Sequence, residues 1–549
     1  MNLQLRATFL VLVISILAAC APTTQSAPAS TAEPTLTPAP TQDAETFPWW
    51  NETVFYEIFV RSFRDSDGDG IGDFNGITEK LDYLEDLGIK GLWLMPINPS
   101  PSYHGYDVTD YYAVNPDYGT MEDFKHLLEE ARARDIKIII DLVLNHTSTQ
   151  HSWFEAALSA ESEYHDWYVW SETDPGFRGP WGAQAWYRAS NDLYYYAIFW
   201  DQMPDLNYDN PAVQEEAKKM AAFWLEEVGV DGFRLDAVRY LAEDEKLADA
   251  ESTHAYLEEW GEYYRSVDPE AFTVGEAWTS NATVKEYVAT NRELDAAFNF
   301  DLADQIIKGI HKDGTNASLR FTLQTTIRDF PEQDNANFIT NHDINRVMSQ
   351  FGGDLGKAKV AAGILLTAPG IPFIYYGEEI GMTGTKPDEL IRTPMQWSDE
   401  EGAGFTEGIP WQAINSDYRE VNVEAQTGDR DSLLEHYRNL IQLRNAHPAM
   451  QTGKTYVTDS SSNKLVSYLR ASEDEALLVL INIDDVPVTD YELSLSTGNL
   501  SGSYNATSLL GDSTMESLQA NPSGGFDGYT PLSEVPPYAV IVIQLTPLN

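Results

Sequence analysis

The strongest constraint on the fold is a repeated alternation of apolar, β-prone segments with helix-like segments over residues 47–450. Short apolar runs such as Gly91–Pro96 and Ile136–Leu144 are typical of strands that are covered on both faces. Between the strands, segments such as Gly76–Ile89 and Thr120–Asp135 place apolar residues at helical spacing. The pattern predicts about eight strand–helix units, and therefore an α/β fold built as a (β/α)8 barrel. The expected strands are Val54–Val60, Gly91–Pro96, Ile136–Leu144, Val230–Asp236, Phe272–Glu276, Ala297–Leu302, Asn337–Asn341 and Ile371–Tyr376, with Gln333–Asn337 leading into the seventh.

Two further domains are expected. The connection after the third strand is far longer than an ordinary loop and is rich in Trp and Tyr, which predicts a small domain inserted at residues 149–205. Its aromatic rings would form the core of that domain or stack on sugars. Residues 453–549 show short alternating segments between Gly, Ser, Asn and Pro, which predicts a C-terminal antiparallel β-sandwich. The barrel would then comprise residues 47–148 and 206–452.

The N-terminal segment has the pattern of an export signal. An apolar run within residues 1–20 ends in Leu17-Ala-Ala-Cys20, which resembles the lipobox of a bacterial lipoprotein signal. We expect cleavage before Cys20, lipidation of its thiol and a membrane tether, which would place the protein outside the cytoplasm, on the bacterial cell surface or in the periplasm. An ordinary secretory signal is the alternative. Cys20 is the only cysteine, so no intrachain disulfide is possible, and residues 21–46 are predicted to be a disordered linker rich in Pro, Thr and Ser.

The charge balance limits the classes of partner. The 549 residues include 86 Asp and Glu against 35 Lys and Arg, a formal net charge of −51. Such a surface repels nucleic acid and anionic lipid and suits a neutral substrate. Much of this charge is also explained by solubility alone. We therefore expect no nucleic-acid partner.

Four of the predicted strands carry polar residues at or near their carboxyl ends, which is where catalytic residues gather in a barrel. They are Asp141–His146 after the third strand, Arg234 and Asp236 on the fourth, Glu276 after the fifth and Asn341–Asp343 after the seventh. Arg234 beside Asp236 favours the ionised carboxylate that a nucleophile requires. An isolated Arg–Asp pair is more often structural, so the prediction depends on carboxylates from three strand ends meeting at one site.

Together these motifs resemble those of the α-amylase family of glycoside hydrolases. The likeness also includes His104-Gly-Tyr-Asp107 and Met203-Pro-Asp-Leu-Asn207, the latter typical of an intermediate group that contains bacterial lipoprotein α-amylases. The resemblance implies that Asp236 is the nucleophile, Glu276 the general acid/base and Asp343 a third carboxylate that binds sugar hydroxyls. It places the substrate-binding positions at Tyr106, Asp107, His146, Arg234, His342 and Arg392.

The segment Asp65-Ser-Asp-Gly-Asp-Gly-Ile-Gly-Asp73 has oxygen ligands at alternate positions, a pattern that suits Ca²⁺. The resemblance implies a structural Ca²⁺ without a part in bond cleavage; a polar turn without metal is the alternative. A second Ca²⁺ at Asn145 and Asp205 is left open. The first set of ligands would be Asp65, Asp67, Asp69, the Ile71 carbonyl and Asp73.

The expected activity is endo-hydrolysis of α-1,4-glucosidic bonds in an α-glucan by a monomeric, retaining enzyme. The segment Arg392-Thr-Pro-Met-Gln-Trp397 is also similar to α-glucosidases, so an exo-acting α-glucosidase or oligo-1,6-glucosidase is the first alternative. A glucan-binding lipoprotein without activity is the second.

Overall fold

The computed structural model describes residues 47–548 apart from 181, 243–246, 291, 312–313 and 511–513. The predicted signal segment with Cys20 and the predicted linker at residues 21–46 therefore lie outside the described residues. Within the described part of the chain, no helix is both long and apolar enough to cross a membrane.

Eight parallel strands form a closed barrel in the order β1-β11-β10-β9-β8-β7-β3-β2, which confirms the predicted fold class. Barrel strands that follow one another in the chain are neighbours, and the last, β11, pairs with the first through Phe55 and Phe373. The strands are β1 (Phe55–Ile58), β2 (Gly91–Leu94), β3 (Lys137–Leu142), β7 (Gly232–Leu235), β8 (Phe272–Gly275), β9 (Ala296–Phe298), β10 (Asn335–Asn337) and β11 (Ile371–Tyr375).

All eight predicted strands are present, most of them a few residues shorter than predicted, and the sixth and seventh differ in ways that polar side chains explain. The sixth strand, β9, ends at Phe298, because Asn299 caps the following helix by accepting a hydrogen bond from the backbone N–H of Leu302 at 3.0 Å. The seventh, β10, begins earlier than expected. The buried amides of Asn335 and Asn337 both donate to the Pro369 carbonyl, at 3.0 and 2.7 Å, so polar residues occupy a strand that a hydrophobic pattern does not reveal.

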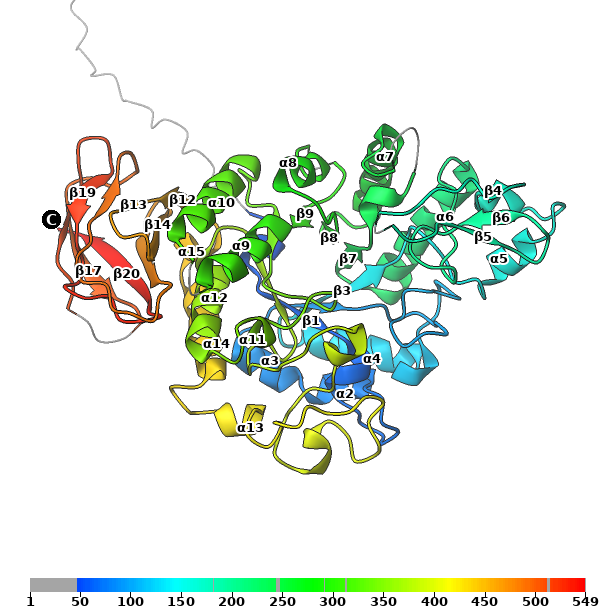
Figure 1. The fold of residues 1–549 in the computed structure, drawn as a ribbon, viewed down its shortest axis with the longest axis horizontal. Helices are drawn as coiled ribbons and strands as arrows, with labels where there is room; N and C mark the ends of the chain where they lie inside the picture. The colour runs from blue at the N-terminus through cyan, green and yellow to red at the C-terminus, as the bar shows by residue number, and fades with distance from the viewer. Residues whose placement is uncertain are drawn as a thin grey trace, which may run out of the picture. The chain divides into compact units, whose positions relative to one another are not determined.

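Helices with buried apolar faces cover the barrel (Figure 1). The predicted helix at residues 76–89 is two helices, α2 (Phe74–Glu79) and α3 (Leu81–Leu87), separated at Lys80. The other α-helices are α1 (Val60–Phe63), α4 (Met121–Arg132), α5 (Ser152–Ala157), α6 (Pro211–Ala222), α7 (Glu251–Val267), α8 (Asn281–Val284), α9 (Phe300–Ile310), α10 (Asn316–Asp329), α11 (Val347–Gln350), α12 (Leu355–Thr367), α13 (Val423–Gln426), α14 (Leu433–Ala446) and α15 (Pro448–Gln451).

The entry into strand β7 depends on backbone conformations that suit glycine. Helix α6 continues as a π-helix over Phe223–Val228 and ends at Gly229, which has a φ of 90°. At Gly232, a Cβ atom would lie 1.9 Å from the Phe272 carbonyl oxygen of the neighbouring strand. Glycine therefore allows β7 and β8 to approach closely at the start of the strand that leads to Asp236.

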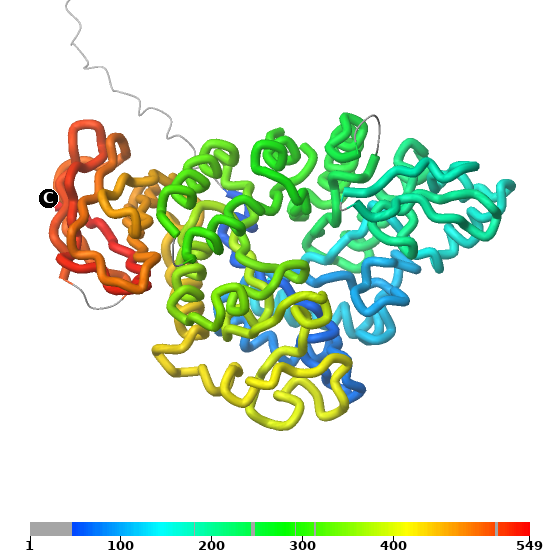
Figure 2. The backbone as a smooth tube through the Cα atoms, viewed as in Figure 1, coloured from blue at the N-terminus to red at the C-terminus, as the bar shows by residue number. Residues whose placement is uncertain are grey.

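The segment between β3 and α6 forms the predicted inserted domain, which Figure 2 shows as a lobe coloured cyan to green. Its sheet has the order β4-β6-β5. Tyr168, Tyr195 and Tyr196 are buried in it, whereas Trp200 is 42% exposed, so the rings serve mainly as core. The strands are β4 (Trp170–Ser171), β5 (Trp186–Arg188) and β6 (Tyr194–Tyr196).

The C-terminal region consists of antiparallel strands in a six-stranded and a three-stranded sheet around a separate apolar core. The order of the larger sheet is β12-β14-β15-β20-β17-β18, and that of the smaller is β13-β16-β19. The strands are β12 (Lys454–Val457), β13 (Asp459–Ser460), β14 (Leu465–Ala471), β15 (Ala476–Asn482), β16 (Leu493–Leu495), β17 (Ser503–Ser508), β18 (Leu518–Gln519), β19 (Phe526–Tyr529) and β20 (Val540–Pro547).

Candidate active site

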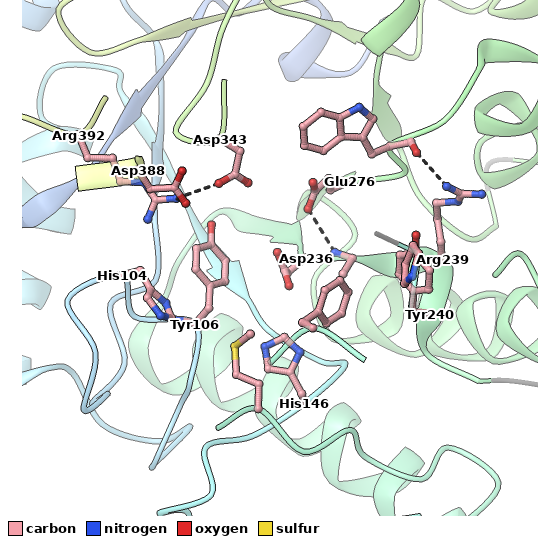
Figure 3. A pocket seen from close by; sticks show the side chains of 15 residues that line it. His104, Tyr106, His146, Asp236, Arg239, Tyr240, Glu276, Asp343, Asp388 and Arg392 are labelled. Atoms are coloured by element: carbon pink, nitrogen blue, oxygen red, sulfur yellow. Dashed lines mark hydrogen bonds and ion pairs between the residues drawn. The ribbon is translucent and has the colours of Figure 1, made fainter. Parts of the chain in front are cut away.

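A cavity of about 490 Å³ opens where the carboxyl ends of the barrel strands meet (Figure 3). The three predicted catalytic carboxylates line it together, although they come from separate segments of the chain. The lining residues are His104, Tyr106, His146, Pro180, Phe199, Met203, Asp236, Ala237, Arg239, Tyr240, Glu276, Trp278, Asp343, Asp388 and Arg392.

Strand register places Asp236 beside Glu276. Leu235 of β7 is paired with Gly275 of β8, and each carboxylate is the next residue along its strand. The Glu276 backbone N–H donates to the Leu235 carbonyl at 2.9 Å, which fixes this offset. Asp343 reaches the same cavity from the loop after β10, where its backbone N–H donates to Asn341 Oδ1 at 3.0 Å. The barrel therefore brings together carboxylates that are distant in sequence.

One buried guanidinium is shared by carboxylates from three strand ends. Arg234 Nη1 donates to Asp236 Oδ1 at 2.9 Å, and Nη2 donates to Glu276 Oε2 at 2.5 Å. Nη1 also lies 2.7 and 2.9 Å from the two oxygens of Asp141, which is fully buried at the end of β3. Asp141 belongs to the predicted strand-end segment Asp141–His146, but no role was predicted for its side chain. Its pairing with Arg234 in the register of β3 and β7 was the missing signal, and it requires the tertiary fold.

The carboxyl groups of Asp236 and Glu276 both have raised pKa values. Burial raises the pKa of Asp236 to about 6, although Arg234 acts in the opposite direction. Burial also raises the pKa of Glu276 to about 7. Arg234 lowers this pKa, whereas repulsion from Asp236 and Asp343 raises it further. Arg234 thus favours the ionised form of Asp236, as expected from the sequence, but the loss of hydration on burial outweighs the guanidinium and the pKa of Asp236 is raised overall. Glu276 nevertheless remains the weaker acid.

Asp343 has the opposite electrostatic environment. Burial favours its neutral form, but the attraction of His342 and Arg392 outweighs burial and holds its pKa well below the usual range. Arg392 Nη2 donates to Asp343 Oδ1 at 2.8 Å. The His342 ring lies between Asp343 and Glu57, with its Nδ1 2.5 Å from Glu57 Oε1. The carboxylates of Asp343 and Glu57 raise the pKa of His342 to about 10 despite burial. His342 is therefore a charged imidazolium between the carboxylate of Glu57 and the ionised carboxylate of Asp343.

The remaining predicted substrate positions divide into two groups. Tyr106 and His146 line the cavity; burial lowers the pKa of His146 to about 3, and its Nε2 has no hydrogen-bond partner among the described residues. A neutral imidazole with a free ring nitrogen suits a sugar hydroxyl. Asp107, in contrast, is not among the lining residues, and its Oδ1 accepts hydrogen bonds from the hydroxyls of Ser100 and Ser102. Its contact with substrate remains a prediction.

The acidic loop, defined as residues 65–73, brings carboxylates together between α1 and α2. Oxygen atoms of Asp65, Asp67 and Asp73 lie within 4.8 Å of one another, a set of hard oxygen donors that suits Ca²⁺. Asp69 is outside this group, and its Oδ1 accepts from the Ile71 backbone N–H at 2.8 Å. Of the five predicted ligands, three are thus already grouped.

The second candidate metal position lies where the inserted domain joins the barrel. The Leu206 backbone N–H donates to the Asn145 carbonyl at 2.9 Å, and His146 forms a β-bridge with Asp205. Asn145 Oδ1 is buried without a hydrogen-bond partner among the described residues. The fold brings Asn145 and Asp205 to one junction, and binding of a cation there remains a prediction.

Comparison with known proteins agrees with this geometry. The family model "Alpha amylase, catalytic domain" matches residues 57–453. Alpha-amylase 3 of Dictyoglomus thermophilum is 43% identical over 446 residues, which cover 80% of this chain and 87% of that protein. Oligo-1,6-glucosidase of Bacillus cereus is 35% identical over 511 residues, covering 79% of this chain and 90% of that protein. A solved α-amylase from H. orenii is 41% identical, with a TM-score of 0.78, and the match covers 90% of this chain and 99% of that one.

Replacement of Arg234 by methionine should lower the free energy of unfolding by about 3–5 kcal/mol at pH 7, because buried carboxylates lose their cation. Asp236 and Glu276 have folded pKa values of about 6 and about 7, above their unfolded values, so protonation at lower pH favours the folded state. The loss in Arg234→Met should therefore be smaller at pH 5, as measured by urea denaturation. Arg239→Met, which removes a pair with the half-buried Asp249, should cost less at pH 7 and change little with pH. An equal loss for Arg234→Met at both pH values would contradict this account.

Proposed function

The chain belongs to the α-amylase family of glycoside hydrolases, and from this premise we propose that it hydrolyses internal α-1,4-glucosidic bonds of starch, glycogen and maltooligosaccharides with retention of configuration. The observation that carries the proposal is the convergence of Asp236, Glu276 and Asp343 on one cavity at the carboxyl ends of the barrel strands. The similarity to an α-amylase over most of the chain supports the choice of bond and substrate.

In the proposed reaction, the ionised carboxylate of Asp236 attacks the anomeric carbon while the carboxylic acid of Glu276 donates its proton to the leaving oxygen. This step forms a β-glucosyl ester on Asp236 and releases the rest of the chain. Glu276, now ionised, removes a proton from water as the water attacks the ester, which restores both residues and gives an α-configured product. The pKa values of about 6 for Asp236 and about 7 for Glu276 support this division. Near neutral pH the group with the higher pKa, Glu276, keeps more of its proton and can donate it, whereas Asp236 is mostly ionised.

The spacing of the two carboxylates supports a retaining mechanism. Both contact adjacent nitrogens of the same guanidinium, Arg234, at 2.9 and 2.5 Å, so their oxygens are close together. Retaining glycosidases place the two carboxyl groups about 5–5.5 Å apart, whereas inverting enzymes need a wider gap that admits a water molecule. A shared guanidinium favours the closer arrangement.

Charged groups around the reacting sugar favour a neutral ligand. Arg392 is paired with Asp343 at 2.8 Å, and Arg239 is paired with Asp249 at 2.6 Å. The guanidinium groups that line the cavity are therefore already neutralised and do not offer a site for an anionic sugar. Asp343, His146 and Tyr106 would instead orient the hydroxyls and the face of the reacting glucosyl unit.

The first alternative is an exo-acting α-glucosidase or oligo-1,6-glucosidase. The similarity to oligo-1,6-glucosidase of Bacillus cereus supports it as much as the similarity to α-amylases supports the endo activity. The second alternative, a glucan-binding protein without activity, would not require the acid and nucleophile to be placed together. Trp278, which lines the cavity and is 46% exposed, offers a surface on which a longer chain could continue, which favours the endo enzyme.

Purified protein should release reducing sugar from starch as a mixture of maltooligosaccharides, and Glu276→Gln should lower kcat by about 10²–10⁴-fold because the leaving oxygen is no longer protonated. Glu286→Gln changes an exposed glutamate further along the chain, outside the cavity lining, and serves as the matched control that should retain activity. Glucose as the sole product from starch, with hydrolysis of isomaltose, would instead establish the exo alternative. Equal inactivity of wild type and Glu276→Gln would leave the binding protein.

The activity should depend on pH through the same two groups. Below about pH 6, Asp236 becomes protonated and loses its nucleophilic form; above about pH 7, Glu276 loses the proton that it must donate. We therefore expect a narrow bell-shaped profile of kcat/KM on maltooligosaccharides with a maximum between these values. α-Glucosyl fluoride, whose leaving group needs no proton, should lose the decline on the alkaline side. An alkaline limb that is identical for both substrates would contradict the role of Glu276.

We also propose that the acidic loop binds a structural Ca²⁺ through Asp65, Asp67 and Asp73, with Asp69 and the Ile71 carbonyl completing the set. The grouping of three carboxylates supports this site. The ion would neutralise repulsion within the loop and stabilise its connection between α1 and α2.

The location outside the cytoplasm on a lipidated Cys20 remains a proposal that rests on the sequence of residues 1–46.

Removal of Ca²⁺ with a chelator should lower the Tm, because an ion at about 100 times its Kd contributes about 2.7 kcal/mol to the folded state. Asp67→Asn should weaken this dependence without requiring a change elsewhere, since Asp67 is exposed. Asp110→Asn is a matched control: Asp110 is also exposed and also accepts from the backbone N–H two residues later, at 2.9 Å, but lies outside the loop. A Tm that is the same with Ca²⁺ and with chelator would exclude the metal.

A further inference from the structure

Arg392 is held beside the proposed third carboxylate by contacts on several sides. Its side chain is buried, with Nη2 donating to Asp343 Oδ1 at 2.8 Å and Nε donating to the His342 carbonyl at 2.9 Å. The guanidinium also lies 5.9 Å from the centre of the Tyr103 ring, within the range of a cation–π contact. The orientation of Asp343 therefore depends on what fixes Arg392.

Trp411 reaches Arg392 by two independent routes. Its ring stacks on Tyr103 at a centroid distance of 5.4 Å and an angle of 24°, so it supports the ring beneath the guanidinium. Its indole Nε1 donates to Ser62 Oγ at 3.0 Å, and this hydroxyl in turn donates to the Arg392 backbone carbonyl at 2.5 Å. One side chain thus supports both the backbone and the guanidinium of Arg392. Neither Tyr103 nor Trp411 lines the cavity.

The acidic loop fixes Trp411 from the far side. The Trp411 backbone N–H donates to the Gly70 carbonyl at 2.9 Å, and the Asp65 N–H donates to the Phe405 carbonyl at 2.9 Å. Thr406 Oγ1 forms a short hydrogen bond with Asp65 Oδ2. Packing is close as well, since a Cβ atom on Gly70 would lie 1.9 Å from the Ile409 carbonyl oxygen. The segment at residues 404–411 is therefore built onto the loop.

We propose that Trp411 and Tyr103 are positioning residues that hold Arg392 against Asp343, and that the acidic loop anchors them. This inference rests on the proposed function for its effect on substrate, because Asp343 is proposed to bind the reacting sugar. It extends the role of the loop: besides stabilising the fold, the loop sets the strength of substrate binding through Trp411, Tyr103 and Arg392. Of the residues in this chain of contacts, Trp411 and Tyr103 do not line the cavity, whereas Arg392 does.

Trp397 provides a matched control for a tryptophan with a structural role alone. Its indole Nε1 donates to the Phe63 carbonyl at 2.8 Å, so it binds the same short helix, α1, as Trp411 does through Ser62. Its ring packs edge to face on Phe63 and Tyr83. Loss of either tryptophan should destabilise this region, but only loss of Trp411 should release Arg392.

The test is a double-mutant cycle on kcat/KM. Trp411→Leu should lower kcat/KM about tenfold, mainly through KM, since a displaced Asp343 binds the sugar less well. Trp411→Phe keeps an aromatic ring that can stack on Tyr103 but loses the indole N–H, so it should lower kcat/KM less than Trp411→Leu does. It replaces Trp411→Leu in the cycle if that variant does not fold. In an Arg392→Gln background, the same changes at Trp411 should cost less than about twofold, because the group through which they act is gone. Additive losses would overturn the proposal. Trp397→Phe should lower the Tm and leave KM within about twofold.

A second readout does not require activity. Hydrogen exchange of the backbone amides over residues 388–396 should be faster in Trp411→Leu and in Thr406→Val, which removes the hydroxyl contact with Asp65, and unchanged in Trp397→Phe. If wild type does not cleave glucan but this pattern appears, the proposed function fails while the positioning role stands. If exchange over residues 388–396 is the same in Trp411→Leu and wild type, the positioning role fails whatever the activity.

Discussion

The active site depends on one buried guanidinium. Arg234 is almost completely shielded from water and contacts Asp141, Asp236 and Glu276, each at the carboxyl end of a different strand. A buried charge of either sign is costly unless it is paired and hydrogen-bonded, so the arginine and the carboxylates are stable only together. Closure of the barrel sets the distances between these strands, and it thereby sets the distance between the carboxyl groups of Asp236 and Glu276.

Differences in surroundings give chemically similar groups different states. Burial brings Asp236 and Glu276 close to neutral pH, whereas His342 and Arg392 keep Asp343 ionised. The histidines diverge in the same way. His146 is neutral because burial dominates, and His342 is charged because Glu57 and Asp343 lie on either side of its ring. One cavity therefore combines two carboxyl groups with raised pKa values, an ionised carboxylate and a neutral imidazole, which suits the proposed division of roles among them.

The acidic loop and the catalytic cavity are linked through packed side chains. Trp411 contacts the loop at Gly70 and contacts Arg392 through Ser62 and Tyr103. This arrangement explains how a loop outside the cavity lining could influence substrate binding without contacting substrate. The loops beyond the strands, rather than the barrel, are also where enzymes with a common catalytic core acquire different substrate preferences.

The order of strand–helix units, the polar residues at strand ends and the acidic loop were all predicted from the sequence, because hydrophobic periodicity and ligand spacing are properties of near neighbours in the chain. What the fold alone decided involves pairs that are distant in sequence. Asp141 and Arg234 are 93 residues apart, and Glu57 and His342 are 285 apart, so their contacts arise from barrel closure and strand register. The pKa of Asp236 shows the same limit: its neighbour Arg234 is visible in the sequence, but the burial that outweighs Arg234 exists only when the barrel is closed.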